Sequence, residues 1–228
     1  MKKIAALVVA AGSSSRMGSN KSKPQDKSVN YKSENTSLPD KSRAIKSYGG
    51  IKQLLPWGDT TLLGHAIDQA LAANVEEVVV VLGARYAFIE PTIRDKNVKV
   101  LHHESWENGL GSSIAYGVNF IDRERESNAV LITLADQPLI DTAYLNSLIS
   151  HEIKNPKQII ATQYPNKIGV PALFPKKYFK DLIKLDKDYG AKHILNNPEA
   201  NVLVIDAKER IADIDTPEDY EKLKGCQK

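Results

Sequence analysis

The feature that most limits how this chain can fold is an alternation of short, continuously apolar runs with segments of helical periodicity. Strands covered on both faces of a sheet appear as unbroken apolar runs, not as alternating apolar and polar residues. Strands are therefore expected at Ile4–Val9, Glu77–Leu82, Val98–Leu101, Ala129–Leu134, Gln158–Thr162 and Val202–Ile205. Strands that alternate with helices predict an α/β fold with a doubly wound, mostly parallel sheet.

Helical spacing fills most of the intervals between these runs. Helices are expected over Thr61–Ala73, Tyr86–Arg94, Gly111–Asp122, Thr142–Ile153, Lys176–Leu185 and Pro217–Lys224. Ala172–Phe174, which follows Pro171, is expected as a short strand added at an edge of the sheet. With 228 residues the chain has the length of one domain, so residues 1–228 are expected to share one core.

The segment 19–50 interrupts this pattern. It is rich in Lys, Ser, Asn and Asp, and it holds seven basic against three acidic side chains. The net charge of +3 of the whole chain therefore resides in this segment, and the remainder is close to neutral. We interpret 19–50 as a flexible basic insertion in the first loop. A lid that attracts phosphates is the functional alternative, and a nucleic-acid-binding loop would rest on this segment alone, so no nucleic-acid partner is expected.

The composition favours a cytoplasmic protein. No apolar run approaches the ~20 residues that span a bilayer, so no membrane partner is expected. Ile4–Val9 followed by Ala10 and Ala11 imitates a signal peptide, but a buried strand followed by a turn accounts for the same residues. The single cysteine, Cys226, excludes an intramolecular disulfide and is typical of a reducing compartment.

The first loop contains the strongest local signal for a ligand. The apolar run ends in Ala10, Ala11 and Gly12, and Ser13-Ser14-Ser15-Arg16 follow. Small side chains let a ligand approach the backbone, and Gly12 and Gly18 can adopt positive φ, so that successive N–H groups form an anion-binding nest. Arg16 adds a permanent positive charge with donors suited to phosphate. The alternative is a turn of small residues with a surface arginine.

Two aspartates and a lysine are candidates for the same site. Asp136 follows the run Ala129–Leu134, at the carboxyl end of a strand where open parallel sheets bind their ligands. Asp213 and Asp215 flank the apolar Ile214 and are expected to share the opposite face. Mg²⁺ binds one or two protein carboxylates and completes its octahedron with water and phosphate oxygens, so Asp136 and Asp215 are candidate ligands. Lys52 is a candidate second phosphate ligand.

These motifs together resemble the MobA-like nucleotidyltransferases, and among them the molybdenum cofactor cytidylyltransferases of the MocA type. The matching motifs follow the order of that family over almost the whole chain: Val9–Gly18, Lys52–Pro56, Trp106–Gly109 with Ser112 and Ser113, Ala135–Pro138, Gly169 with Pro171, Asp188–Lys192 and Asp213–Asp219. Each motif alone is weak evidence for this family, whereas the whole set in the family's order is strong evidence.

The resemblance implies a Rossmann-like domain of the nucleotide-diphospho-sugar transferase type. Such an enzyme binds CTP and Mg²⁺ and transfers CMP to the phosphate of molybdopterin, releasing pyrophosphate. Carried over to this chain, the roles fall into three groups. Arg16 and Lys52 would hold the triphosphate, Asp136 and Asp215 would hold Mg²⁺, and Ala10, Ala11, Gly12, Ser112 and Gly83 would line the nucleotide. An apo-molybdoenzyme or its chaperone is an expected protein partner.

Departures from the family pattern leave the acceptor open. They are the long insertion, His103 in place of a usual Asn, Val170 between Gly169 and Pro171, and Lys192 in place of a frequent Arg. The alternatives are a sugar- or polyol-phosphate nucleotidyltransferase of the same fold and a non-catalytic nucleotide-binding maturation factor.

Overall fold

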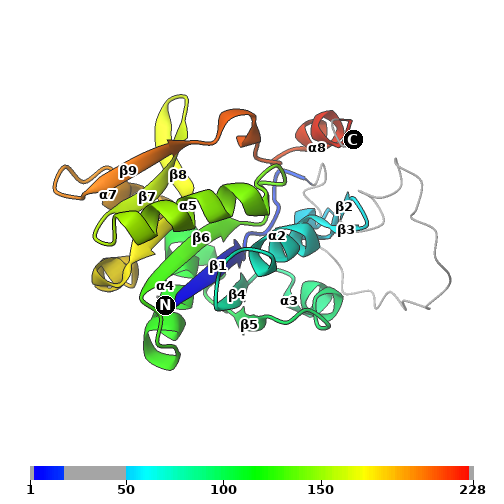
Figure 1. Ribbon diagram of the computed structural model, residues 1–228. Helices are drawn as coiled ribbons and strands as arrows, with labels where there is room; N and C mark the ends of the chain where they lie inside the picture. The colour runs from blue at the N-terminus through cyan, green and yellow to red at the C-terminus, as the bar shows by residue number, and fades with distance from the viewer. Residues whose placement is uncertain (1–2, 18–49, 226–228) are drawn as a thin grey trace.

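The computed structural model describes residues 3–17 and 50–225, and a seven-stranded sheet forms its centre (Figure 1). The strands are β1 (Ile4–Ala10), β4 (Glu77–Leu82), β5 (Lys99–His102), β6 (Ala129–Leu134), β7 (Ile159–Tyr164), β8 (Lys167–Pro175) and β9 (Val202–Asp206). Their order across the sheet is β5-β4-β1-β6-β8-β7-β9, and every neighbouring pair that excludes β8 is parallel. The predicted α/β, mostly parallel sheet is confirmed.

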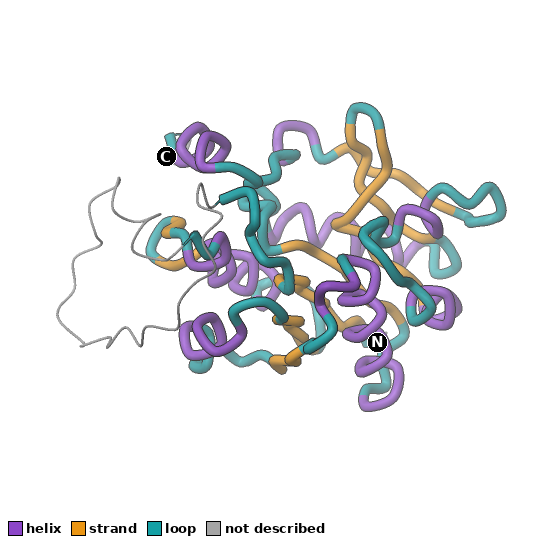
Figure 2. Tube along the Cα trace, turned by 180° about the vertical axis from the view of Figure 1, so that it is seen from behind, coloured by secondary structure: helices purple, strands orange, loops and turns teal. Residues whose placement is uncertain are grey.

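Helices cover both faces of this sheet, as the two opposite views show (Figures 1 and 2). The α-helices are α2 (Leu62–Leu71), α3 (Tyr86–Ile89), α4 (Leu110–Glu124), α5 (Thr142–Lys154), α6 (Phe179–Leu182), α7 (Lys192–Leu195) and α8 (Pro217–Lys224). Short 3₁₀ turns lie at Lys52–Leu54, Glu90–Thr92, Trp106–Asn108, Lys176–Tyr178 and Lys208–Arg210. A small hairpin, β2 (Pro56–Trp57) with β3 (Thr60–Thr61), precedes α2.

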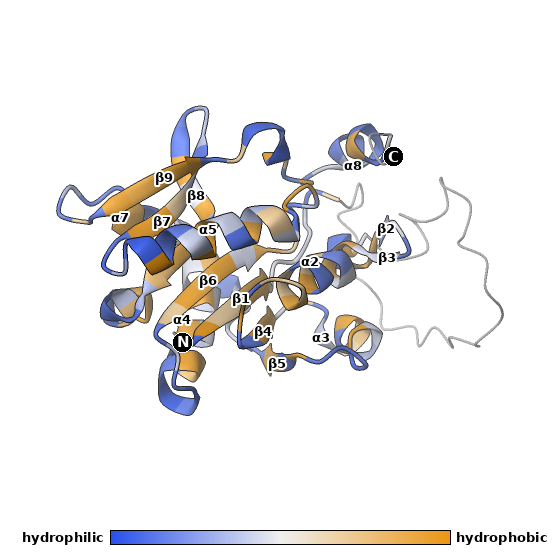
Figure 3. Cartoon of the chain, viewed as in Figure 1, coloured by the Kyte–Doolittle hydropathy of each residue, from blue (hydrophilic) through white to orange (hydrophobic). Residues whose placement is uncertain are grey.

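Strand β1 lies at the centre of the core because each of its residues is buried. Leu7 belongs to a cluster with Ile114 and Val118 of α4, whereas Val8 belongs to another with Leu63 and Ile67 of α2. Successive side chains of a strand point to opposite faces, so an unbroken apolar run is what this position requires. The strands accordingly form the hydrophobic centre of the molecule (Figure 3).

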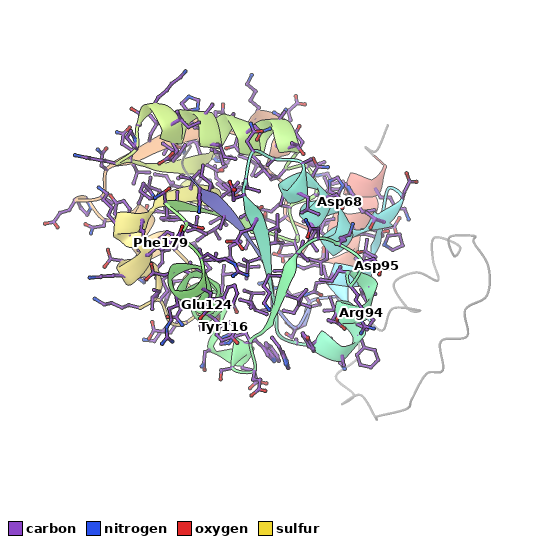
Figure 4. All side chains as sticks on the ribbon, turned by 60° about the horizontal axis from the view of Figure 1, so that its bottom comes forward. Asp68, Arg94, Asp95, Tyr116, Glu124 and Phe179 are labelled. Atoms are coloured by element: carbon purple, nitrogen blue, oxygen red, sulfur yellow. The ribbon has the colours of Figure 1, made fainter. Side chains whose placement is uncertain are left out.

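Helix α4 packs closely on the sheet at Gly117. A β-carbon at Gly117 would lie 2.5 Å from Leu7 Cδ1, so the absence of a side chain lets α4 approach β1. Figure 4 labels Tyr116 and Glu124 on this helix, and Phe179 of the neighbouring α6, whose side chain is buried in the same cluster.

The prediction of an edge strand at Ala172–Phe174 is wrong. Strand β8 runs from Lys167 to Pro175 and lies inside the sheet, antiparallel to both β6 and β7, while the edges are β5 and β9. Ala172, Leu173 and Phe174 are fully buried. Since β7 and β8 are joined by a short turn, β8 returns beside β7 and its other side pairs with β6.

Two predicted helices are shorter than expected, because each includes a 3₁₀ turn. Helix α3 ends at Ile89, and the 3₁₀ turn Glu90–Thr92 follows. Pro91 in this turn has no N–H to donate to the carbonyl of Ala87, as continuation of the α-helix would require. The segment from Lys176 begins as a 3₁₀ turn before α6. The predicted insertion at 19–50 lies outside the described residues except for Gly50. None of the helices in the described ranges has the length and apolar character needed to cross a membrane.

Candidate active site

Four charged side chains predicted as site residues form one network. The Lys52 Nζ lies 2.8 Å from Asp136 Oδ2 and 3.2 Å from Asp215 Oδ1, so one ammonium group bridges both carboxylates. The other oxygen of Asp215 accepts a hydrogen bond from Arg16 Nη1 at 2.6 Å. The structure thus brings together the two aspartates, 79 positions apart in the numbering, and the two cations.

A backbone contact and a buried side chain bring Asp215 to this place. The N–H of Ile214 donates to the carbonyl oxygen of Asp136 at 2.9 Å, which joins the two acidic segments directly. Ile214 is fully buried in a cluster with Leu55 and Tyr220. The next residues begin α8 with a capping box. Thr216 Oγ1 accepts from the N–H of Asp219, and the Asp219 carboxylate accepts from the N–H groups of Thr216 and Asp215. The Thr216 hydroxyl also donates to the Asp219 carboxylate at 2.8 Å, and this bond, together with those from the two backbone N–H groups, lowers the pKa of Asp219.

Asp213 lies two residues before Asp215 but has a different environment from it. Its Oδ1 accepts from Gln137 Nε2 at 3.0 Å, and the same amide donates to the Tyr164 hydroxyl at 2.7 Å. Although part of the Asp213 side chain is exposed, burial of the carboxyl raises its pKa, and the nearby Asp136 carboxylate adds to this effect. Burial also raises the pKa of Tyr164, which donates its proton to the carbonyl of Val170. This network supports the wall beside Asp136 and makes no contact with Lys52.

A cavity of about 560 Å³ opens beside the charged network. Its lining comes from the first loop, from the segment around Lys52 and Gln53, from the end of β6, and from the start of α4. Arg16, Lys52, Asp136 and Asp215 lie in this lining, as do Ala10, Ala11 and Gly12. The cations and carboxylates therefore share one cavity with the small residues of the first loop.

The first loop differs in one respect from the prediction. The residue with positive φ among the described residues of the loop is Ser14, with φ 58°, and not Gly12, whereas Gly18 lies outside the described residues. A β-carbon at Gly12 would meet nothing within 4 Å. Gly12 therefore leaves open space in the cavity wall, and the sharp turn falls on a serine whose hydroxyl is hydrogen-bonded to Gln53.

Two predicted nucleotide-binding residues do not line the cavity. A β-carbon at Gly83 would lie 2.4 Å from Trp106 Cβ and 2.8 Å from the carbonyl oxygen of Ala11, so Gly83 is covered by Trp106. Ser112 donates to the carbonyl of Gly109 and contacts His103 Nε2 at 3.1 Å, while its neighbour Ser113 lines the cavity. A helix turns about 100° per residue, so the choice between adjacent serines depends on how the helix is rotated.

Sequence reasoning assigned no role to three further lining residues, although the matched motifs contain them: Gln53, Glu107 and Asp188. Gln53 is a buried polar side chain. Its position directly after the predicted site residue Lys52 was the one sequence signal that could have indicated a role in the site. The carboxylates of Glu107 and Asp188 approach from two loops that only the tertiary fold brings together.

The acidic pair is suited to a divalent cation. Asp136 Oδ1 is buried, and no hydrogen-bond donor contacts it among the described residues. Its other oxygen and Asp215 already share one cation, Lys52. No group of three or more metal-binding side chains occurs in residues 3–17 and 50–225, but Mg²⁺ needs only one or two carboxylates when phosphate and water complete its shell.

Comparisons with known proteins identify a matching family and a related protein. The family model for the MobA-like NTP transferase domain matches residues 41–202. The purine catabolism protein PucB of Bacillus subtilis is 26% identical over 191 residues, which cover 77% of this chain and 89% of PucB.

Solved structures show the same fold. Rv0371c of Mycobacterium tuberculosis superposes with a TM-score of 0.73 at 24% identity, with 98% of each chain covered, and Rv0371c has also been solved with manganese. A nucleotidyl transferase from Methanothermobacter thermautotroptrophicus superposes with a TM-score of 0.74 at 20% identity, covering 98% of this chain and 97% of that one. The nucleotide-diphospho-sugar transferase type of sheet is thereby confirmed.

Proposed function

The chain belongs to the MobA-like NTP transferase family, a family of nucleotidyltransferases, and on that premise we propose that it transfers CMP from CTP to the phosphate of molybdopterin. Pyrophosphate is the second product. The observation that carries this proposal is that Arg16 and Lys52 meet Asp136 and Asp215 at the wall of one cavity.

The chemistry of the reaction requires such a cluster of charges. An oxygen of the acceptor phosphate attacks the α-phosphorus of CTP in line with the departing pyrophosphate. Two anions must meet, so the protein mainly has to position them and offset their charge. A phosphate acceptor is already ionised, and no general base is needed.

Arg16 and Lys52 would supply positive charge to the triphosphate and to the leaving pyrophosphate. In the structure both contact carboxylates, so binding a nucleotide would transfer them from Asp136 and Asp215 to phosphate oxygens. Mg²⁺ would be held by Asp136 and Asp215 and would supply positive charge that offsets the negative charge of the triphosphate. Its ligands would be the oxygens that the two cations release and the unpaired Asp136 Oδ1.

The first loop favours a pyrimidine nucleotide. Ala11 is buried in the loop, and its carbonyl oxygen accepts from the N–H of Ala84 at 3.0 Å, which holds its position. Its methyl group would narrow the site against a purine. Calorimetry in the presence of Mg²⁺ is therefore expected to show CTP binding more tightly than GTP, and equal affinities would contradict this choice of nucleotide.

The direct test is pyrophosphate release with each nucleoside triphosphate and purified molybdopterin. We expect release with CTP and molybdopterin. Sugar phosphates and polyol phosphates serve as alternative acceptors in the same assay, and release with one of those alone would replace molybdopterin as the acceptor. Tight binding of CTP without turnover on any acceptor would instead support a non-catalytic maturation factor that delivers cofactor to an apo-molybdoenzyme.

A further inference from the structure

A buried glutamine beside Lys52 holds the first loop in shape. The Gln53 side chain is only 4% exposed, and its amide makes three hydrogen bonds to the loop. Nε2 donates to the carbonyl oxygens of Ala10 at 3.0 Å and Gly12 at 2.9 Å. Oε1 accepts from the Ser14 hydroxyl at 3.0 Å. One side chain thus contacts three alternate residues of the loop that lines the cavity.

Ser14 extends this connection to Lys52. Its hydroxyl oxygen also accepts from the backbone N–H of Lys52 at 3.1 Å. Residues 18–49 separate the two segments in the sequence, so these bonds join the loop before that stretch to the chain after it. The backbone of Ser14 has a positive φ, which serine seldom adopts without a compensating contact. The hydrogen bond between the Ser14 hydroxyl and Gln53 supplies that contact.

The hydrogen bonds of the loop carbonyls determine where its N–H groups point. In a planar trans peptide the C=O of one residue and the N–H of the next point in opposite directions. The carbonyls of Ala10 and Gly12 are directed at Gln53, and that of Ala11 is paired with Ala84. Within the described residues no acceptor contacts the N–H groups of Ala11, Gly12 or Ser13, all three of which line the cavity.

We propose that Gln53 is a positioning residue for phosphate binding. By fixing the carbonyls of Ala10 and Gly12 it turns the N–H groups of Ala11 and Ser13 toward the nucleotide, as an anion-binding nest requires. This inference rests on the proposed function, since it assigns Gln53 to the triphosphate subsite of the same cavity. In this role Gln53 acts through the backbone of the loop, and it needs no contact with the acceptor or the reacting atoms.

The test is a calorimetric titration with inorganic pyrophosphate and Mg²⁺. Gln53→Met keeps the size of the side chain and removes its polar contacts. We expect pyrophosphate binding to weaken on the order of tenfold, since two donated hydrogen bonds that orient the loop are lost. The KM for CTP should rise by a similar factor with a smaller change in kcat, because the loop binds phosphate in the ground state and in the transition state alike.

Gln69→Met is the matched control. Gln69 lies on α2, and its Oε1 accepts from the N–H and the hydroxyl of Thr142, both at 2.8 Å, outside the cavity. This variant should lower the melting temperature and leave pyrophosphate affinity unchanged. If Gln53→Met does not fold, Ser14→Ala replaces it, with an expected weakening of several-fold.

The outcomes separate this inference from the proposed function. Folded Gln53→Met that binds pyrophosphate as tightly as the wild type would overturn the role of Gln53, and so would equal weakening in Gln69→Met. Wild-type protein that binds pyrophosphate but never turns over CTP would refute the proposed function and leave the role of Gln53 standing.

Discussion

At the scale of single residues, opposite charges are held in contact inside one cavity wall. The Lys52 side chain is 15% exposed and that of Asp136 is 23% exposed, so their contact is screened less than a surface ion pair would be. Arg16 and Asp215 are more exposed and are freer to exchange partners. Because of this difference in exposure, we expect Arg16 to separate from Asp215 readily. Lys52 should separate from Asp136 only when a competing anion or cation binds.

Removing Lys52 should therefore tighten divalent metal binding in the absence of nucleotide. In Lys52→Met the two carboxylates lose the ammonium that competes with a metal ion, and we expect Mn²⁺ affinity to increase on the order of tenfold. Electron paramagnetic resonance of free Mn²⁺ measures this directly. Lys96→Met is the control, because Lys96 pairs with Asp68, labelled in Figure 4, outside the cavity. Unchanged or weaker Mn²⁺ binding in Lys52→Met would argue against a shared cation position.

Gly12 tests whether the small residues of the loop make room for a ligand. A methyl group at this position meets no protein atom, so Gly12→Ala should fold with unchanged stability. Because Gly12 lines the cavity, the same methyl group should weaken CTP binding by about tenfold or more. Gly58→Ala provides the contrast. Gly58 has φ +57° in open space, so that variant should lose about 1 kcal/mol of stability and bind CTP normally. Normal CTP binding by Gly12→Ala would mean that the nucleotide lies elsewhere.

At the scale of elements, the site depends on how one short helix begins. The helix α8 has eight residues, and its capping box fixes the backbone next to Asp215. The sequence pattern Thr-Pro-Glu-Asp was sufficient to predict this start, because the cap and its partner lie three residues apart. The same local reasoning failed for α3 and α6, where 3₁₀ turns replace part of the predicted helix.

Loss of the α8 cap should therefore weaken metal use at the site in addition to lowering the stability of the protein. Thr216→Ala removes an N-cap and is expected to lower the free energy of unfolding by about 1 kcal/mol. It should also raise the metal concentration needed for pyrophosphate release, since the backbone of Asp215 is bound to the same capping box. Thr61→Ala removes the equivalent cap of α2, where Thr61 accepts from Gly64. Equal metal requirements in the two variants would show that α8 does not position Asp215.

At the scale of the whole molecule, the sequence predicted which segments are strands better than how they pair. Strands β1, β4 and β6 are unbroken apolar runs, and their predicted bounds agree with the structure to within one residue. Strand β8 contains Gly169 and Pro171, which are unfavourable in strand interiors, so only its last residues were recognised. Its pairing with β6 joins residues about 40 positions apart, and no local pattern contains that information.

The central position of β8 can be tested by stability. Strand β8 lies between β6 and β7, and its Phe174 side chain is fully buried in the cluster that includes Phe179, so Phe174→Ala should cost about 3–5 kcal/mol in the free energy of unfolding. Val204 on the edge strand β9 is 39% exposed, and Val204→Ala should cost less than about 1 kcal/mol. Equilibrium denaturation measures both values. A cost for Phe174→Ala as small as that for Val204→Ala would place β8 at an edge.

For the candidate site, too, the sequence predicted some features and left others to be found in the structure. Arg16, Lys52, Asp136 and Asp215 were named from the sequence because each lies next to a recognisable strand end, loop or cap. Gln53 and Asp188 lie in the matched motifs but were assigned no role, because their proximity to the cavity arises from contacts between distant segments. Motifs therefore predicted the network of Arg16, Lys52, Asp136 and Asp215, and the structure was needed to identify the other residues that line the cavity.

The most direct measurement is the rate of pyrophosphate release by Asp136→Ala with CTP, Mg²⁺ and molybdopterin. Asp141→Ala is the matched control, since Asp141 caps α5 and pairs with Arg210 outside the cavity. We expect Asp136→Ala to fold and to lose at least about a hundredfold in rate, while Asp141→Ala keeps the wild-type rate at lower stability. Pyrophosphate release at the full rate by Asp136→Ala would contradict the assignment of Asp136 and Asp215 as the pair of carboxylates that hold the metal.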